Sequence, residues 1–507
     1  MHRTIYRQVT ALTFIFAGIF TALAADTPKA IVIVLDGLRP DYVTQDLMPN
    51  VYALGQRGVV CTNHHSVFPT VTRVNSSSFS TGCYPAHHGI MGNTIYVPAV
   101  DKEKGFSTGD SENLMKLNEV TGGKVLTVPT LGEILESAGM KLFVASSGSS
   151  GSSYLLNPKV KGGGIVNTEM VLPESAKAHV DELLGPVPEE AIPNAPANRR
   201  IIDGLLRIGV DELHADMIFL WVTDPDHTAH PKGIGSPETT AALKHVDEEV
   251  GRLLGSLKAK SLDDETNIFI TSDHGFSTQT GKNSIPQLLV QKGVKKSLAS
   301  TDVIVSEGAI YVDNQDPEKI RAIVEVLQAT EWIGAVFTKA STANDVKGDV
   351  PGTFSFESIF WNHDRAGDIL TDANWSDDAN DTGWKGTTLL QGVAGHGTSS
   401  PYDIHNTLIA AGPGIKQGLV SEVPTGNVDI APTVLHVLGV KDAPKMDGRV
   451  VHEILLNGPD PKSLEVTRAT ETVSNTVTSI TYTSALHRST VDGHTYLDFT
   501  KVTREPR

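Results

Sequence analysis

Three apolar runs dominate the pattern of hydrophobic and polar positions along the chain. They cover residues 30–35, 217–222 and 267–271, and each consists mostly of aliphatic, aromatic or β-branched residues. Such runs are typical of strands in a parallel sheet, where both faces of a strand are buried. Each run is soon followed by acidic residues, which are Asp36 after the first, Asp224 and Asp226 after the second, and Asp273 after the third.

Helix-like stretches separate these runs, at residues 49–58, 130–139 and 239–258. Alternation of strands and helices predicts an α/β fold with a doubly wound, mostly parallel sheet that is flanked by helices. Ligands of such sheets bind at the carboxyl ends of the strands. The aspartates that follow the three runs are therefore candidates for a functional site.

The pattern changes between residues 301 and 383, where we expect an inserted β-α-β cap. Its predicted elements are a strand at 308–312, a helix at 317–329 and a strand at 334–337. Residues 25–300 and 384–507 would form the main domain, and the cap would select the substrate, by analogy with other inserted caps. Residues 465–500 predict an antiparallel β-hairpin that closes an edge of the sheet.

Two further features are a segment rich in glycine and serine and a pair of cysteines. Residues 146–153 are rich in glycine and serine, which indicates a flexible surface loop. Cys61 and Cys83 are the only cysteines, and their spacing matches no zinc-site pattern. In an oxidising compartment they would pair if their geometry allows it, and two buried thiols are the alternative.

The first 24 residues have the features of a secretory signal. Arg3 and Arg7 precede an apolar run at residues 11–24 that ends in small residues, as signal peptidase requires. A membrane anchor is the alternative, but the run is shorter than the roughly 20 residues of a bilayer span. We expect residues 1–24 to be a signal peptide, and the protein to be secreted to the bacterial periplasm without a membrane anchor.

The chain is acidic, with 59 aspartates and glutamates against 42 lysines and arginines and a formal net charge of −17. Such a charge disfavours binding to a nucleic acid polymer through the general field of the protein. A bound metal would be a local source of positive charge. The expected partner is therefore a small anionic molecule in one pocket.

Carboxylates and imidazoles gather near the ends of the predicted strands. Asp226 and His230 stand four residues apart, so one helical turn would direct both side chains to one point. Asp273 and His274 are adjacent, and His396 lies between two glycines, where the backbone approaches a ligand closely. The full set is Asp36, Asp226, His230, Asp273, His274 and His396. Three carboxylates and three imidazoles suit zinc, and their number suits two ions.

A candidate nucleophile lies in residues 68–75, where an extended stretch gives way to a predicted helix. Thr70 and Thr72 both offer hydroxyls there. A helix N-terminus favours an alkoxide and binds an incoming phosphate through its free amides. The alternative is that one of these threonines only caps the helix. Spacing alone does not choose between the two hydroxyls.

In this order, the motifs resemble those of the nucleotide pyrophosphatase/phosphodiesterase family of the alkaline phosphatase superfamily. The matching stretches span residues 30 to 400 and are 33–41, 68–75, 81–82, 84–85, 88–90, 225–226 with His230, 272–275 and 395–397. The resemblance implies that the main domain described above, residues 25–300 and 384–507, is an alkaline-phosphatase-like catalytic domain. It also implies two Zn²⁺ per chain.

The resemblance assigns roles residue by residue. Thr72, rather than Thr70, would be the nucleophile and itself a metal ligand, and Asn93 would donate a hydrogen bond to a phosphate oxygen. The first zinc would be held by Asp36, Thr72, Asp273 and His274, and the second by Asp226, His230 and His396. His64, His65, His87 and His88 are expected to be hydrogen-bonded wall residues instead of ligands.

The resemblance also implies the reaction. Thr72 would attack phosphorus in line and form a phosphothreonine, which water then hydrolyses, with two zinc ions roughly 4 Å apart meeting the charge on the reacting oxygens. We therefore expect an exported two-zinc phosphodiesterase or nucleotide pyrophosphatase. Its substrate would be a small phosphate ester, and neither the leaving group nor the oligomeric state is specified.

Two departures bear on the substrate. Arg73 follows Thr72 where many family members have an aromatic residue. Related phosphate monoesterases carry a Lys-x-Arg pair near residue 150, where this chain has serines. Without that cation, a singly charged diester is the expected substrate. The alternatives are a phosphate monoesterase or phosphonoacetate-type hydrolase on the same site, and a zinc-dependent envelope binding protein without turnover, against which the intact Thr72 argues.

Overall fold

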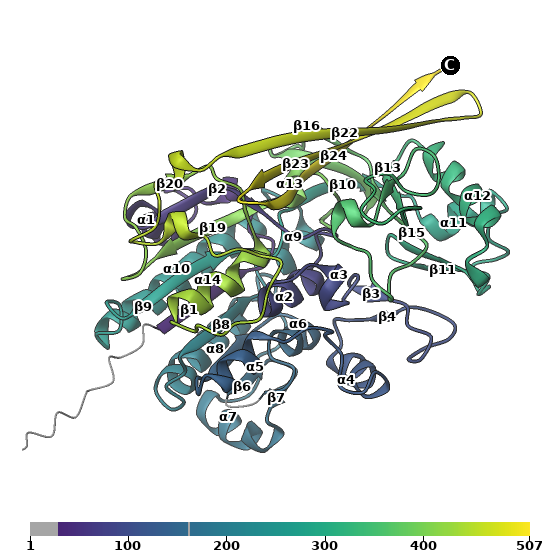
Figure 1. Cartoon of the computed structure of the whole chain (residues 1–507). Coiled ribbons are helices and arrows are strands. Elements are labelled where there is room, and N and C mark those ends of the chain that lie inside the picture. Colours follow the sequence, from purple (N-terminus) through teal and green to yellow (C-terminus); the bar gives the residue numbers. More distant parts are fainter. Residues whose placement is uncertain (1–28, 161–162) are drawn as a thin grey trace, which may run out of the picture.

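The computed structural model describes residues 29–160 and 163–507. A ten-stranded sheet forms its centre (Figure 1). Strand β1 (Lys29–Leu35) lies between β8 (Met217–Val222) and β9 (Thr266–Thr271), and it is parallel to both. All residues of β8 and β9 are buried. The three apolar runs therefore form neighbouring buried parallel strands, as predicted. The expected signal peptide lies outside the described residues.

The remaining strands extend the sheet on both sides. Beyond β8 come β5 (Leu142–Ser146), β6 (Gly164–Asn167) and β7 (Val171–Leu172). Beyond β9 come β19 (His405–Ala411), β2 (Val59–His65), β20 (Leu419–Ser421) and β21 (Thr425–Gly426). Only β7 and β19 run against the others in this sheet. The sheet is thus mostly parallel, as the alternation of elements predicts.

Helices cover both faces because side chains along β1 alternate between them. Ile31, Ile33 and Leu35 pack in one core with α1, α8 and α10, which span Pro49–Arg57, Ala195–Gly204 and Pro237–Ala259. Ala30, Val32 and Val34 pack in the other with α2, α5, α6 and α14, which span Thr72–Thr81, Leu131–Ser137, Ser150–Leu156 and Ile430–Val437. The doubly wound α/β fold is confirmed.

The glycine and serine stretch at 146–153 is not a surface loop, so that prediction is wrong. It ends β5 and begins α6, whose residues are all buried, with Ser149 capping the helix. A Cβ at Gly151 would lie 2.0 Å from the Thr108 carbonyl oxygen. Small side chains therefore serve close packing here, which composition alone cannot distinguish from flexibility.

The expected insertion forms a separate five-stranded sheet. Its strands are β11 (Val303–Ser306), β12 (Ala309–Val312), β15 (Ile369–Ala373), β13 (Ile333–Thr338) and β14 (Phe354–Ser355), in that spatial order. Helix α12 (Pro317–Gln328) connects β12 to β13, so the three predicted elements are present. Strand β15 lies between β12 and β13, and the simple β-α-β unit is therefore extended.

A four-stranded sheet joins this region to the main domain. It contains β16 (Trp375–Ala379), β17 (Lys385–Gln391), β10 (Ser277–Gly281) and β18 (Ala394–Gly395). Strands β16 and β17 form an antiparallel pair. The boundary that we expect at residue 383 lies in the turn between them.

The C-terminal strands differ from the predicted hairpin in number and place. Strands β22 (Val466–Val477), β23 (Ile480–Val491) and β24 (His494–Pro506) form their own antiparallel sheet and add no strand to the central one. Figure 1 shows these yellow strands running across to the inserted sheet. The Tyr482 hydroxyl donates to the Gly334 carbonyl, and Tyr482 and Leu486 share a core with β13. This sheet therefore braces the insertion instead of closing a sheet edge.

The structure also bears on the pairing of the two cysteines and on membrane-spanning helices. Cys61 and Cys83 are buried free thiols, which is the second of the two alternatives. Among residues 29–160 and 163–507, no helix is both long enough and apolar enough to cross a membrane.

Candidate metal centre and active site

The candidate ligands meet at one edge of the central sheet. Asp36 directly follows β1, Asp226 begins α9 (Asp226–Lys232) just after β8, and Asp273 follows β9. The register pairs Leu35 with Val222 and Val34 with Thr271, so the three strands end side by side. All six predicted carboxylates and imidazoles fall into two groups of three, Asp36 with Asp273 and His274, and Asp226 with His230 and His396.

The first group is fully buried. His274 Nε2 lies 3.0 Å from Asp273 Oδ2 and 3.6 Å from Asp36 Oδ1. Gly37 donates its amide to the other oxygen of Asp273, at 3.1 Å, which fixes that carboxylate. The group therefore presents one nitrogen and two oxygens to a common point.

The second group shares a single carboxylate oxygen. Asp226 Oδ1 lies 3.2 Å from His230 Nε2 and 3.4 Å from His396 Nε2. The spacing of four residues on α9 brings Asp226 and His230 together, whereas His396 comes from the loop after β18. The imidazoles of His274 and His396 are stacked with ring centroids 3.4 Å apart, so the two groups are adjacent.

Each histidine of the two groups is oriented by a backbone carbonyl. His230 Nδ1 lies 2.9 Å from the Ala394 oxygen, and His274 Nδ1 lies 2.9 Å from the Gly275 oxygen. His396 Nδ1 lies 2.8 Å from the Thr70 oxygen. A proton on Nδ1 leaves the lone pair of Nε2 free, and this arrangement is usual for metal-binding histidines.

The carboxylates supply the clearest sign that a cation fits. One oxygen in each is buried without a hydrogen-bond partner: Asp36 Oδ1, Asp226 Oδ1 and Asp273 Oδ2. These are the same oxygens that face the histidine Nε2 atoms. Burial, together with the charges of Asp273 and Asp226, raises the pKa of Asp36 well above its usual value. Buried unpaired carboxylate oxygens are costly, and divalent cations would satisfy them.

The two threonines occupy different positions. Thr72 begins α2, and its Oγ1 lies 3.4 Å from His274 Nε2. The Thr70 hydroxyl instead donates to the Thr398 carbonyl and accepts the Gly397 amide. Thr70 thus holds the loop that carries His396, while Thr72 faces the first ligand group.

Asn93 lies beside the start of α2. Its Oδ1 accepts a hydrogen bond of 3.0 Å from the backbone amide of Arg73, which is the residue after Thr72. The Arg73 guanidinium is turned toward Gly109, where a Cβ would lie 2.9 Å from Nη2. The Asn93 side chain therefore has its amide nitrogen available beside the candidate nucleophile.

A cavity of about 520 Å³ opens at the second ligand group. His230, His396 and Asn93 line it from the main domain, and the insertion supplies further walls through Glu307 and Trp332. Among the described lining residues there is no lysine or arginine. The cavity is large enough for a small organic phosphate and spans both the main domain and the insertion.

Two side chains outside the predicted site residues, Trp221 and Ser272, also shape the site. Trp221 is fully buried in β8, yet its Nε1 donates a 2.9 Å hydrogen bond to Asp36 Oδ2. The Ser272 hydroxyl accepts the Leu38 amide and donates to the His274 carbonyl, which ties two ligand loops together. A buried indole N–H requires an acceptor. The place of Trp221 in a predicted buried strand that is followed by aspartates could therefore have indicated a hydrogen bond to a strand-end carboxylate.

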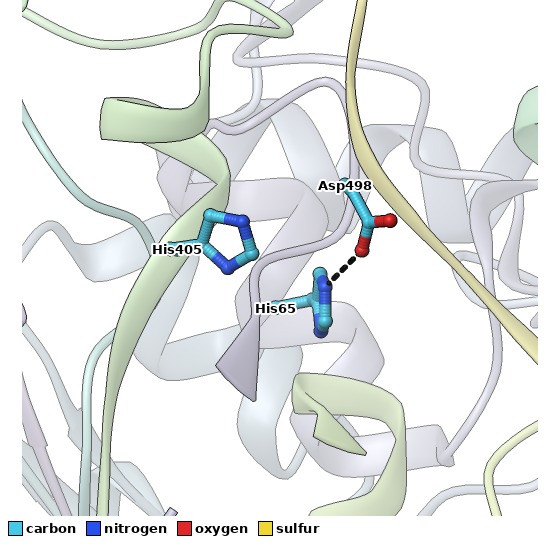
Figure 2. Close-up of side chains that lie close together, drawn as sticks. All are labelled: His65, His405 and Asp498. Carbon is cyan, nitrogen blue, oxygen red and sulfur yellow. Dashed lines mark hydrogen bonds and ion pairs between the residues drawn. The ribbon is translucent and has the colours of Figure 1, made fainter. Parts of the chain in front are cut away.

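A third group of ligand-type side chains lies elsewhere, formed by His65, His405 and Asp498 (Figure 2). His65 uses both ring nitrogens, facing the Thr425 carbonyl at 2.8 Å and Asp498 Oδ1 at 2.9 Å. The other Asp498 oxygen accepts from Ser489. Unlike the strand-end carboxylates, Asp498 has no orphaned oxygen, so this group is a hydrogen-bonded tie between β2 and β24. His65 is thus a wall residue, as expected.

This third group predicts acid sensitivity of the fold. Burial, and then the charge of His65, lowers the pKa of His405 to about 3. Between pH 6.5 and 3 the unfolded chain protonates this imidazole and the folded chain does not, so stability falls as pH falls through that window. In urea unfolding with zinc present, wild type should lose about 2 to 3 kcal/mol more than His405→Gln between pH 7 and 4. Equal losses would contradict a neutral, half-buried His405 in the folded protein.

Comparison with known proteins identifies the family of this chain. Residues 30–400 match the model of the type I phosphodiesterase / nucleotide pyrophosphatase family. The human bis(5'-adenosyl)-triphosphatase ENPP4 is 25% identical over 450 residues, which cover 85% of this chain and 83% of that protein. Human ectonucleotide pyrophosphatase/phosphodiesterase family member 1 is 30% identical over 265 residues, covering 51% of this chain and 25% of that protein.

Solved structures agree in fold. Human ectonucleotide pyrophosphatase/phosphodiesterase 5 superposes with a TM-score of 0.59 at 21% identity, over 85% of this chain and all of that one. An inactive variant of the murine enzyme in complex with AMP gives a TM-score of 0.59 at 19% identity, over 84% of this chain and all of that one. The family match covers most of the chain and includes both ligand groups, so the protein belongs to the type I phosphodiesterase / nucleotide pyrophosphatase family of metal-dependent hydrolases.

Proposed function

We propose that this hydrolase is an exported two-zinc phosphodiesterase or nucleotide pyrophosphatase that uses Thr72 as its nucleophile. The observation that carries the proposal is the position of the Thr72 hydroxyl, at the start of α2 and 3.4 Å from His274 Nε2, beside the two ligand groups. Bis(5'-adenosyl)-triphosphatases among the relatives support a nucleotide-like phosphoric ester as substrate.

The donor set supports zinc. Asp36, Thr72, Asp273 and His274 would hold one ion, and Asp226, His230 and His396 the other, because mixed imidazole and carboxylate sites with few ligands favour zinc over magnesium or calcium. When bound, the two ions supply the positive charge that lowers the pKa of the Thr72 hydroxyl and neutralises the phosphate oxygens.

The protein groups would act in a defined order. Thr72 Oγ1 would attack phosphorus in line while the bond from phosphorus to the leaving alcohol or phosphate breaks, and the hydroxyl proton would leave with that group, giving a phosphothreonine. The Asn93 side-chain amide would donate to a phosphoryl oxygen, and the Arg73 amide at the N-terminus of α2, which donates to Asn93 Oδ1, would orient that side chain. Water would then attack phosphorus on the side opposite Thr72 and break its bond to Oγ1, so that one water proton restores the Thr72 hydroxyl and a phosphate monoester is released.

The cavity supports a diester over a monoester. A phosphate monoester carries a second negative charge near neutral pH, and no cationic side chain of the described residues lines the cavity to meet it. The Arg73 guanidinium packs against Gly109 and is absent from that lining. A singly charged diester, or a pyrophosphate whose scissile phosphorus is a diester, therefore fits this site better.

Rates on four substrates test the proposal. Residues 25–507 would be purified with zinc and assayed on a nitrophenyl phosphodiester, a nitrophenyl nucleotide ester, nitrophenyl phosphate and phosphonoacetate. We expect kcat/KM to be at least about tenfold higher for the two diesters than for nitrophenyl phosphate, equivalent to about 1.4 kcal/mol. Preference for the monoester or for phosphonoacetate would reassign the substrate, and no turnover would favour a binding protein.

We propose that residues 1–24 are a signal peptide that directs export and is removed from the mature protein. The apolar run at residues 11–24 and the basic residues before it carry this proposal. Mass determination of the protein released from the periplasm of an expressing bacterium would give the mature N-terminus directly.

A further inference from the structure

The turn between β11 and β12 brings a carboxylate from the insertion to the active site. Ser306 pairs with Ala309, so the turn consists of Glu307 and Gly308 alone. Glu307 has a φ of +55°, a left-handed conformation in which asparagine or glycine is favoured and glutamate is uncommon. An unfavourable residue kept in such a conformation indicates a use for its side chain.

The Glu307 side chain contacts the loop that carries Asn93. Its Oε2 accepts a 3.0 Å hydrogen bond from the Asn93 backbone amide. A Cβ at Gly92 would lie 3.0 Å from the same oxygen, so the backbone at Gly92 rests directly on the carboxylate. Desolvation raises the pKa of Glu307, and the charge of Arg73 and the amides of Asn93 and Thr94 oppose that rise. The contact is therefore a backbone-to-side-chain hydrogen bond between the catalytic loop and the insertion.

Asn93 continues this chain of contacts to the nucleophile. Its side-chain oxygen accepts the backbone amide of Arg73, which immediately follows Thr72. Glu307 thus holds the backbone of Asn93, while the start of α2 holds one end of its side chain. Thr108 donates to the Asn93 carbonyl through its amide and its hydroxyl, so Nδ2 is the polar atom left to donate at the cavity that Asn93, Glu307 and His396 line.

We propose that Glu307 is a positioning residue that holds Asn93 in place for hydrogen bonding to the phosphoryl group, and so couples the inserted sheet to the catalytic centre. This inference rests on the proposed function of Asn93. Glu307 touches neither the nucleophile nor the ligand groups, and acts through the Asn93 backbone. An alternative is that its negative charge acts directly on the substrate, and the two roles predict different kinetics.

A double-mutant cycle of Glu307 and Asn93 on the zinc-loaded enzyme separates the positioning role from a direct effect of charge on the substrate. We expect Glu307→Ala to lower kcat for the nitrophenyl phosphodiester about 10- to 100-fold, with KM changed less than about threefold, since misplacing a transition-state donor mainly affects kcat. Asn93→Ala should cost about 100-fold, and the double variant should lose no more than about threefold beyond Asn93→Ala. Glu307→Gln keeps an acceptor oxygen and should recover most of the loss.

Several results would overturn the inference. Multiplicative losses in the double variant would show that Glu307 acts independently of Asn93. A Glu307→Gln variant as impaired as Glu307→Ala, or a change confined to KM, would assign the effect to charge. Glu325→Gln, an exposed change on α12 of the same insertion, is the matched control and should keep wild-type kcat.

A readout independent of turnover distinguishes this inference from the proposed function. Hydrogen exchange of the Asn93 amide should be at least about tenfold faster in Glu307→Ala than in wild type, because the amide loses its acceptor. Unchanged exchange would overturn the inference even in an active enzyme. If wild type hydrolyses none of the four substrates but the exchange effect is present, the proposed function fails and the structural link stands.

Discussion

Replacing Thr72 by alanine should lower kcat for phosphodiester hydrolysis by at least about 10³-fold, because it removes the nucleophile on which both chemical steps depend. The Thr72 hydroxyl lies at the first ligand group, and the neighbouring hydroxyl of Thr70 is occupied by the loop around Thr398. Steady-state kinetics with a nitrophenyl diester would measure the loss. Acid quenching of wild type during turnover, followed by peptide mass spectrometry, should locate phosphate on Thr72.

Two variants control for indirect effects. Thr72→Ser keeps a hydroxyl and should retain measurable turnover, well above Thr72→Ala. Thr70→Ala removes hydrogen bonds to Gly397 and Thr398, so it should weaken the loop of His396 and give an intermediate loss without removing the phosphoenzyme. Retention of more than about a tenth of wild-type kcat in Thr72→Ala would exclude Thr72 as the nucleophile.

Removing bound metal should abolish hydrolysis and lower the unfolding temperature together. The site buries three carboxylate oxygens without hydrogen-bond partners, and their mutual repulsion without cations destabilises the fold. A metal at 1,000 times its Kd stabilises the folded state by about 4 kcal/mol per site. Dialysis against a chelator, then zinc titration with activity and thermal unfolding as readouts, would test this. We expect activity to return as two zinc ions bind per chain.

Two histidine variants test the number of zinc ions bound per chain, one in the second ligand group and one in the third group. His396→Ala removes a ligand of the second group and should reduce the tightly bound zinc from two ions to about one per chain. His65→Gln alters the third group, in which both ring nitrogens of His65 are already hydrogen-bonded, and should leave two. Metal content by mass spectrometry checks both. Loss of zinc from His65→Gln would mean that the third group binds metal, and full retention in His396→Ala would contradict the second site.

The prediction of individual elements succeeded where one local pattern sufficed. Thr130 and Glu133 form a capping box at the start of α5, and a continuous apolar run made β8 recognisable. Prediction was wrong for α6, where serines and glycines fill a tight interior position. It was also wrong for the C-terminal strands, because pairing partners and the surface against which a strand packs are properties of the whole fold.

The sequence by itself determined the parallel strands, the helices between them and the types of donor at the strand ends, because these follow from local periodicity and from residues near one another in the chain. Local pattern did not show which donors share a point; the family resemblance implied their grouping, and the tertiary structure brings them together. It joined His396 to Asp226 across 170 residues of chain, turned Thr72 rather than Thr70 toward His274, and brought Glu307 of the insertion to Asn93. Such contacts depend on how distant segments pack, and no local pattern encodes the side-chain directions that result.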